Sequence, residues 1–100
     1  MPPDRTRGRE LLDVTVRFPE HVIFRSFARE TVALNLQTGQ FHGLNPTAGR
    51  MVELIQRRPR PREAIAPLAS EYGVPEEQIE RDLAALLALL LERDLIELDS

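Results

Sequence analysis

The chain has 100 residues and a formal net charge of −3, with 42% apolar and 29% charged residues, a composition typical of one globular domain with a single core. The absence of Cys excludes a disulfide framework, a thiolate metal site and a cysteine nucleophile. The acidic balance argues against a general nucleic-acid-binding protein, because such proteins usually carry a basic face.

The N-terminal segment is polar and contains several Pro and Arg residues. We therefore predict a flexible tail over residues 1–13 and an ordered domain over residues 14–100. The tail contains no apolar signal region, so we expect a cytoplasmic protein.

Strand patterns follow the tail. Residues 14–18 alternate between apolar and polar, and residues 22–27 are rich in β-branched and aromatic side chains. The clearest local signal is a β-hairpin, in which residues 31–36 and 40–44 flank a turn that contains Gly39.

After the hairpin the apolar period changes from two to about 3.6. Asn45 can cap a helix that has proline at its first position, and Gly73 can end a second helix in a left-handed conformation. The first predicted helix begins at residue 46 and is broken by the segment 57–61, the second runs from residue 61 or 62 to residue 72, and the third spans residues 76–93. A short extended segment follows over residues 95–98. This order predicts an α+β fold, a three-stranded antiparallel sheet followed by three helices, like a winged helix-turn-helix.

The third helix contains nine consecutive apolar residues, 83–91. This run is less than half of the ~20 residues needed to cross a bilayer, so we predict no membrane span. It does place apolar groups around most of the helix circumference, more than one side of a small core can cover. A second surface is therefore expected to cover part of the helix.

A helical projection at 100° per residue separates the faces of this helix. The stripe expected to pack on the core consists of Ile79, Leu83, Leu86 and Leu90. One flank carries Gln78, Asp82, Ala85 and Leu89, the other carries Leu87 and Leu91, and Ala84 and Ala88 are expected to point away from the core. One flank could line a groove beside the sheet, and a homodimer through this helix is the alternative.

The last strand of the sheet, residues 40–44, is predicted to have one unpaired side. It contains no Pro or Lys that would block the addition of an extended peptide, and Gly43 allows a foreign backbone to approach closely. A free strand edge beside an apolar helix flank predicts a peptide-binding site.

Other functions have little support in the sequence. No nucleophile with a base, catalytic carboxylate pair or metal-ligand cluster is recognisable, so we expect neither catalysis nor a cofactor. A winged-helix DNA-binding regulator is the alternative function. However, the first half of the third helix, residues 76–82, has four acidic residues against one Arg and would repel phosphates.

The hairpin sequence Val-Ala-Leu-Asn-Leu-Gln-Thr-Gly-Gln-Phe-His-Gly-Leu-Asn-Pro-Thr-Ala-Gly over residues 32–49, with the helix over 80–91, resembles the PqqD-like proteins. These are leader-peptide recognition elements of pathways that modify ribosomally made peptides, and the chain is most like the stand-alone form in lasso peptide clusters. Two positions depart from the family pattern. Asp94 replaces the usual Gly after the helix, and Leu86 replaces a residue that is often aromatic.

The resemblance implies an adaptor that binds a precursor leader peptide as an added β-strand. It would then present the precursor to a transglutaminase-like leader peptidase and a lasso cyclase. Asp82 matches an acidic residue common in the family, and would meet a polar or basic group of the leader. The predicted peptide-binding residues are Phe41, His42, Gly43 and Leu44 on the strand and Gln78, Asp82, Ala85, Leu86 and Leu89 on the helix.

Overall fold

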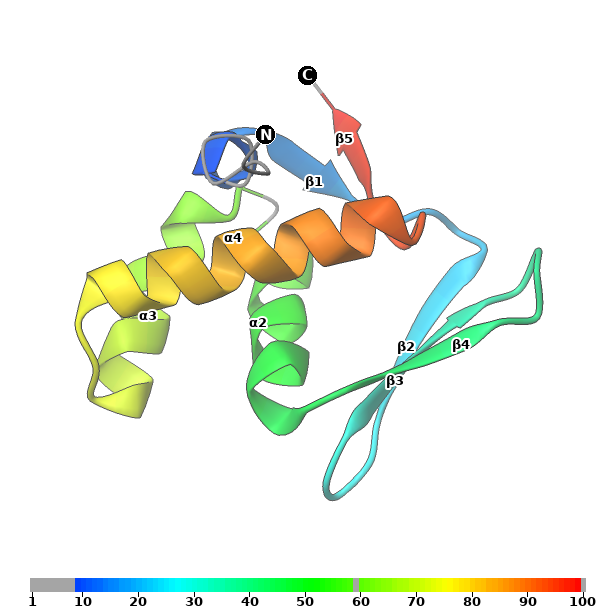
Figure 1. The fold of residues 1–100 in the computed structure, drawn as a ribbon, viewed down its shortest axis with the longest axis horizontal. Coiled ribbons are helices and arrows are strands. Elements are labelled where there is room, and N and C mark those ends of the chain that lie inside the picture. The colour runs from blue at the N-terminus through cyan, green and yellow to red at the C-terminus, as the bar shows by residue number, and fades with distance from the viewer. Residues whose placement is uncertain (1–8, 59, 100) are drawn as a thin grey trace, which may run out of the picture.

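A computed structural model describes residues 9–58 and 60–99. Three antiparallel strands in the order β2-β3-β4 precede three helices, so the predicted fold class is confirmed (Figure 1). The bounds of these elements are β2 Val22–Ser26, β3 Thr31–Asn35, β4 Phe41–Leu44, α2 Pro46–Arg57, α3 Arg62–Tyr72 and α4 Glu76–Glu92.

A second, two-stranded sheet was not predicted. Strand β1 (Thr15–Arg17) pairs antiparallel with β5 (Glu97–Asp99), away from the three-stranded sheet (Figure 1). The segment predicted only as extended, residues 95–98, enters this sheet at its C-terminal end, and Leu95 and Ile96 are buried ahead of β5. The two ends of the described chain therefore meet in the fold.

The predicted flexible tail is wrong at its C-terminal end. Leu11 and Leu12 form the short 3-10 helix η1 (Leu11–Asp13) and are buried in the core next to α4. Asp13 accepts hydrogen bonds from Arg62 of α3, with 3.1 Å between Arg62 Nη2 and Asp13 Oδ2, and this bond lowers the pKa of the carboxyl. Residues 1–8 of the predicted tail lie outside the described residues.

Local capping residues define the helix ends as predicted. The Asn45 side chain accepts a hydrogen bond from the Ala48 N–H at 2.8 Å, and Pro46 is the first residue of α2. Gly73 ends α3 with a φ of 64°, in the left-handed region that glycine adopts without a steric penalty.

Helix α2 approaches the sheet very closely at one glycine. A Cβ atom on Gly49 would lie 2.2 Å from Thr31 Oγ1 of β3, well inside van der Waals contact. Because α2 follows β4 after one residue, this contact fixes the direction in which the chain leaves the sheet.

Helix α4 forms the centre of the core. Its predicted buried stripe is confirmed, with Ile79, Leu83, Leu86 and Leu90 all buried. Ala84 was expected to point away but is buried, as is Leu87, because α3 and η1 also pack against α4. None of the helices in the described part of the chain has the length and apolarity that crossing a membrane requires.

Candidate functional site: a groove between strand β4 and helix α4

Strand β4 is an edge strand, and the register of the sheet shows which of its main-chain groups are free. The Asn35 N–H donates to the Gln40 carbonyl, so the alternating antiparallel ladder directs the main chain of His42 and Leu44 towards β3. The N–H and C=O groups of Phe41 and Gly43 therefore point away from β3, outward from the open edge of the sheet. The predicted unpaired side of this strand is confirmed.

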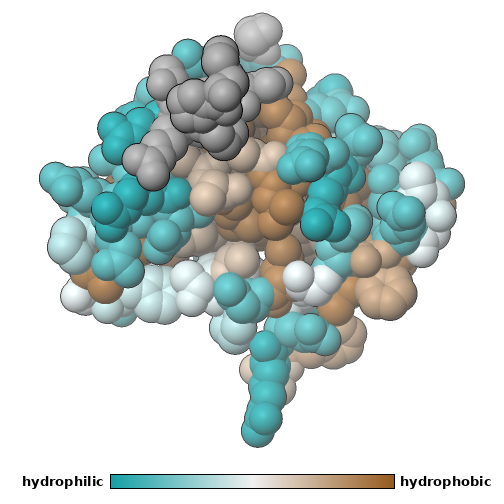
Figure 2. All heavy atoms as spheres, in the orientation of Figure 1, coloured by the Kyte–Doolittle hydropathy of each residue, from teal (hydrophilic) through white to brown (hydrophobic). Residues whose placement is uncertain are grey.

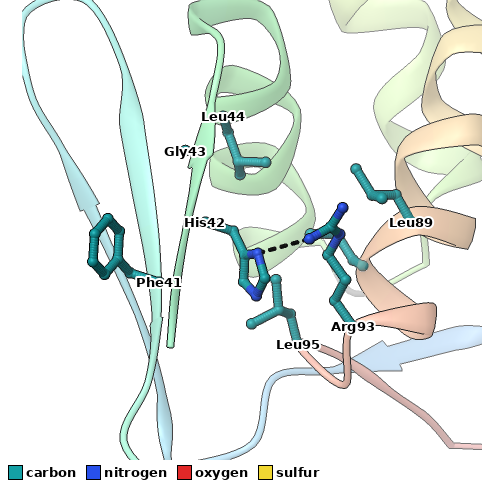
Figure 3. Close-up of a pocket in the computed structure, with 8 residues that line it drawn as sticks. Phe41, His42, Gly43, Leu44, Leu89, Arg93 and Leu95 are labelled. Atoms are coloured by element: carbon teal, nitrogen blue, oxygen red, sulfur yellow. Dashed lines mark hydrogen bonds between the residues drawn. The ribbon is translucent and has the colours of Figure 1, made fainter. Parts of the chain in front are cut away.

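Side chains on β4 alternate between the two faces of the sheet. His42 and Leu44 point towards α4, whereas Phe41 points to the opposite face and is 71% exposed (Figure 3). The main chain of Phe41 borders the site, but its side chain does not enter it. Sequence position alone did not distinguish these two roles.

The facing wall is the part of α4 from Asp82 to its C-terminal end. Leu89, 37% exposed, faces β4 across the groove, and Leu86 is buried at its base. Ala85 and Asp82 are exposed one and two turns before Leu89. The sequence predicted that one of the two flanks of this helix could line a groove. The core covers the flank with Leu87, and the flank with Leu89 is open.

The space between these walls consists of two adjoining cavities of about 280 and 580 Å³, which together are named the β4–α4 groove. Gly43, Leu44 and Leu89 line both of them. The smaller cavity is also lined by Phe41, His42, Leu90, Arg93 and Leu95, and the larger one by Asn45, Thr47, Ala48, Met51, Asp82, Ala85 and Leu86.

The space-filling view shows that the surface is not uniformly polar. Figure 2 shows apolar side chains over the middle of the molecule, where α4 crosses the front, and more apolar surface over the β2–β4 sheet. Polar residues border both areas. Such apolar surface surrounded by polar residues is typical of binding sites.

Arg93 is a residue of the groove that the sequence did not identify. It caps the C-terminal end of α4, and its Nη1 lies 3.0 Å from His42 Nδ1 on β4 (Figure 3). A guanidinium can only donate, so Nδ1 is the acceptor and the imidazole proton is on Nε2. An Arg at the C-terminal end of a helix is expected from the helix dipole alone, so the position of Arg93 in the sequence did not indicate this contact.

The structure brings most of the predicted site residues together. All four strand residues and Asp82, Ala85, Leu86 and Leu89 line the groove. Gln78 lies one turn before Asp82 on the same flank but does not line either cavity. Within residues 9–58 and 60–99 there is no cluster of three or more His, Cys, Asp or Glu that could hold a metal ion.

Fold and groove together define the class, an α+β domain of the winged helix-turn-helix kind with an open sheet edge beside an apolar helix. Residues 30–96 match the family described as Coenzyme PQQ synthesis protein D (PqqD). The chain therefore belongs to the PqqD family.

Two solved structures are similar to this chain over most of its length. One, "TbiB1 in Complex with the TbiA(beta) Leader Peptide", is 32% identical and covers 81% of this chain and 94% of its own, with a TM-score of 0.74. The other, "Lasso peptide synthetase B1 complexed with the leader peptide", is 28% identical and covers 83% and 98%, with a TM-score of 0.75. No curated protein sequence matches this chain.

Proposed function

We propose that this chain is a non-catalytic adaptor that binds the leader region of a ribosomally made precursor peptide, of the lasso peptide class. The observation that carries the proposal is the open main-chain edge at Phe41 and Gly43 beside the apolar flank of α4. The two similar solved structures, both of which contain a leader peptide, support it.

The bound leader would extend the sheet as a fourth strand next to β4. Main-chain hydrogen bonds to Phe41 and Gly43 would contribute affinity for any extended peptide. Alternate side chains would enter the groove against Leu44 and Leu89 and would select the sequence.

Presentation to partner enzymes is the second part of the proposal. With its leader held on this chain, the precursor would reach a transglutaminase-like leader peptidase and then a cyclase. We expect the rate of leader cleavage by that peptidase to rise when this chain is added. A peptidase that cleaves the free precursor equally fast would contradict this part alone.

The binding proposal is tested by Gly43→Pro, with Gly43→Ala as the matched control. Proline removes the N–H that points outward from the open edge, and its ring obstructs an added strand, but no hydrogen bond to β3 is lost. The alanine Cβ would meet only the end of the exposed Glu30 side chain, 3.2 Å away. We expect Gly43→Pro to weaken binding by about 1–3 kcal/mol and Gly43→Ala to change it little.

The neighbouring genes are first searched for a short precursor reading frame, and a synthetic peptide with the leader sequence of that precursor is the probe, titrated by calorimetry. A second measurement leaves the protein unchanged and uses leader peptides N-methylated at every other residue. Strand addition requires that one of the two alternating N-methyl series loses binding and the other retains it. Equal binding by both series, or no binding of the unmodified leader, would contradict the proposal.

A further inference from the structure

The two ends of the β4–α4 groove carry opposite charges. Among the described residues, Arg93 is the only charged one that lines the smaller cavity, and Asp82 is the only charged one that lines the larger cavity. They are 11 positions apart on one helix, which corresponds to about 16 Å along its axis. An extended peptide covers that distance in about five residues.

The charge of Arg93 is not neutralised within the described chain. The described carboxylates that form ion pairs lie elsewhere, and Arg93 is within salt-bridge distance of none of them. Its contact is with the His42 ring, an acceptor without a negative charge in the tautomer that the geometry requires.

The contact with His42 also orients the guanidinium. One N–H of the planar fork is directed at β4, and the other donors remain for a ligand at the mouth of the smaller cavity (Figure 3). A fork held in this way matches a carboxylate better than a flexible cation does. Leu89 and Leu95 line the same cavity and would contact the aliphatic part of such a side chain.

We propose that Arg93 is a specificity residue that selects an acidic side chain of the bound peptide, at the end of the groove opposite Asp82. The inference rests on the proposed peptide-binding function and adds to it a charge requirement. Peptides with Asp or Glu at the position that reaches Arg93 would bind more tightly than otherwise identical peptides with Gln or Lys there.

The test begins with a random peptide library displayed on its own mRNA and selected against the wild-type chain and against Arg93→Glu. We expect wild type to enrich one acidic position among apolar ones, and Arg93→Glu to enrich Lys or Arg there. The best wild-type peptide is then made with Glu and with Gln at that position. Its affinity is measured by fluorescence anisotropy for wild type, Arg93→Gln and, as a matched control, Arg81→Gln, because Arg81 is exposed on the same helix and lines neither cavity.

We expect the Gln peptide to bind wild type about two- to fivefold more weakly at low salt, since the pair is exposed, and the difference to shrink at high salt. Arg93→Gln is expected to bind the two peptides equally, whereas Arg81→Gln, which removes a positive charge outside the groove, keeps the preference. Enrichment of apolar peptides without an acidic position, or an equal preference in Arg93→Gln, would overturn this inference and leave the proposed function standing. Failure to enrich any peptide would overturn both.

Discussion

Leu89 connects the apolar character of α4 to its proposed role. Its side chain is 37% exposed, whereas its neighbour Leu90 is completely buried. Leu89 lines both cavities of the groove, so it can contact a bound peptide without being essential to the core.

We therefore expect Leu89→Asp to weaken leader binding by about 1–3 kcal/mol through the loss of apolar burial. The measurement is calorimetry with the synthetic leader, together with thermal unfolding. Leu98→Asp is the matched control, because Leu98 is also 37% exposed but lies on β5, outside the groove. Unchanged affinity in Leu89→Asp would contradict the assignment of this flank to the peptide.

Asp94 is the one described residue other than glycine with a positive φ, 59°. The Leu95 N–H donates to the Leu90 carbonyl and the Asp94 N–H to the Leu91 carbonyl, so α4 ends in a Schellman motif. Asp94 replaces the Gly that is usual in the family at this position. The helix therefore keeps an ordinary C-terminal geometry, but an aspartate adopts the left-handed conformation that glycine prefers.

Asp94→Gly is expected to stabilise the folded chain by about 0.5–1 kcal/mol, because the steric cost of the left-handed conformation exceeds the added entropy of the unfolded chain. Asp94→Ala is expected to destabilise it, since alanine tolerates this conformation less well than aspartate. Urea unfolding of the three proteins gives the order. A glycine variant less stable than wild type would show that the Asp94 side chain makes a compensating contribution.

At the scale of elements, the contact between α2 and β3 determines how the groove is built. Gly49 has no side chain, so the first turns of α2 can lie against Thr31. Residues Asn45, Thr47, Ala48 and Met51, which line the larger cavity, are all on or next to α2. A shift of α2 away from the sheet would therefore also change the groove.

We expect Gly49→Ala to destabilise the chain by about 1–3 kcal/mol, although alanine is the better helix former by about 1 kcal/mol. The double variant Gly49→Ala with Thr31→Ala removes the Oγ1 that would lie 2.2 Å from the added Cβ, so the Gly49→Ala change is expected to cost less in the Thr31→Ala background than in wild type. Urea unfolding gives both values. Stabilisation by Gly49→Ala alone would contradict the close contact.

At the scale of the whole molecule, exposed ion pairs link elements that are distant in sequence, and two of them join α3 to other parts of the chain through bidentate hydrogen bonds. Arg50 of α2 donates to both oxygens of Glu71 on α3, at 2.9–3.1 Å, and Arg62 of α3 donates to Asp13. Hydrogen bonding from these guanidinium groups lowers the pKa of Glu71 and of Asp13.

Both carboxyls therefore have a lower pKa in the folded chain than in the unfolded chain. As the pH falls, the unfolded chain binds protons first, so the stabilisation present at neutral pH is lost through the acid range down to the folded pKa values. We expect the melting temperature to fall from pH 7 to pH 3, and to fall less in the double variant Asp13→Asn with Glu71→Gln. An equally steep fall in that variant would assign the pH dependence to other carboxyls.

The distribution of charge over the molecule also distinguishes the proposed adaptor from the alternative function, a winged-helix DNA-binding regulator. Glu76, Glu77 and Asp82 are exposed on the first half of α4, the half that would enter a DNA groove. We expect no shift of duplex DNA even at low salt. Binding that disappears as salt is raised would favour the regulator, and a doubled mass in solution without ligand would favour dimerisation through α4.

Several features were predictable because they depend on residues close together in sequence. Hairpin spacing predicted β3 and β4, Asn45 and Gly73 predicted the ends of α2 and α3, and helical periodicity predicted the buried stripe of α4. Most of the residues on β4 and α4 that line the groove were also predicted, but Leu90 and Arg93 were not. That prediction used the open edge and the surplus of leucines, together with the resemblance to the family.

The tertiary structure decided what depends on distant contacts. Residues 15–17 pair with residues 97–99, and no local pattern specifies such a partner. Leu11 and Leu12 follow the polar segment that predicted a flexible tail, yet the core next to α4 buries them. The direction of Phe41 away from α4, and the hydrogen bond from Arg93 to His42, follow from how the sheet packs against the helices.

Sequence thus determined the elements, because capping, turns and amphipathic periodicity are local. Packing decided which flank of α4 stays open and which charges face the groove, because burial depends on the complete set of neighbours.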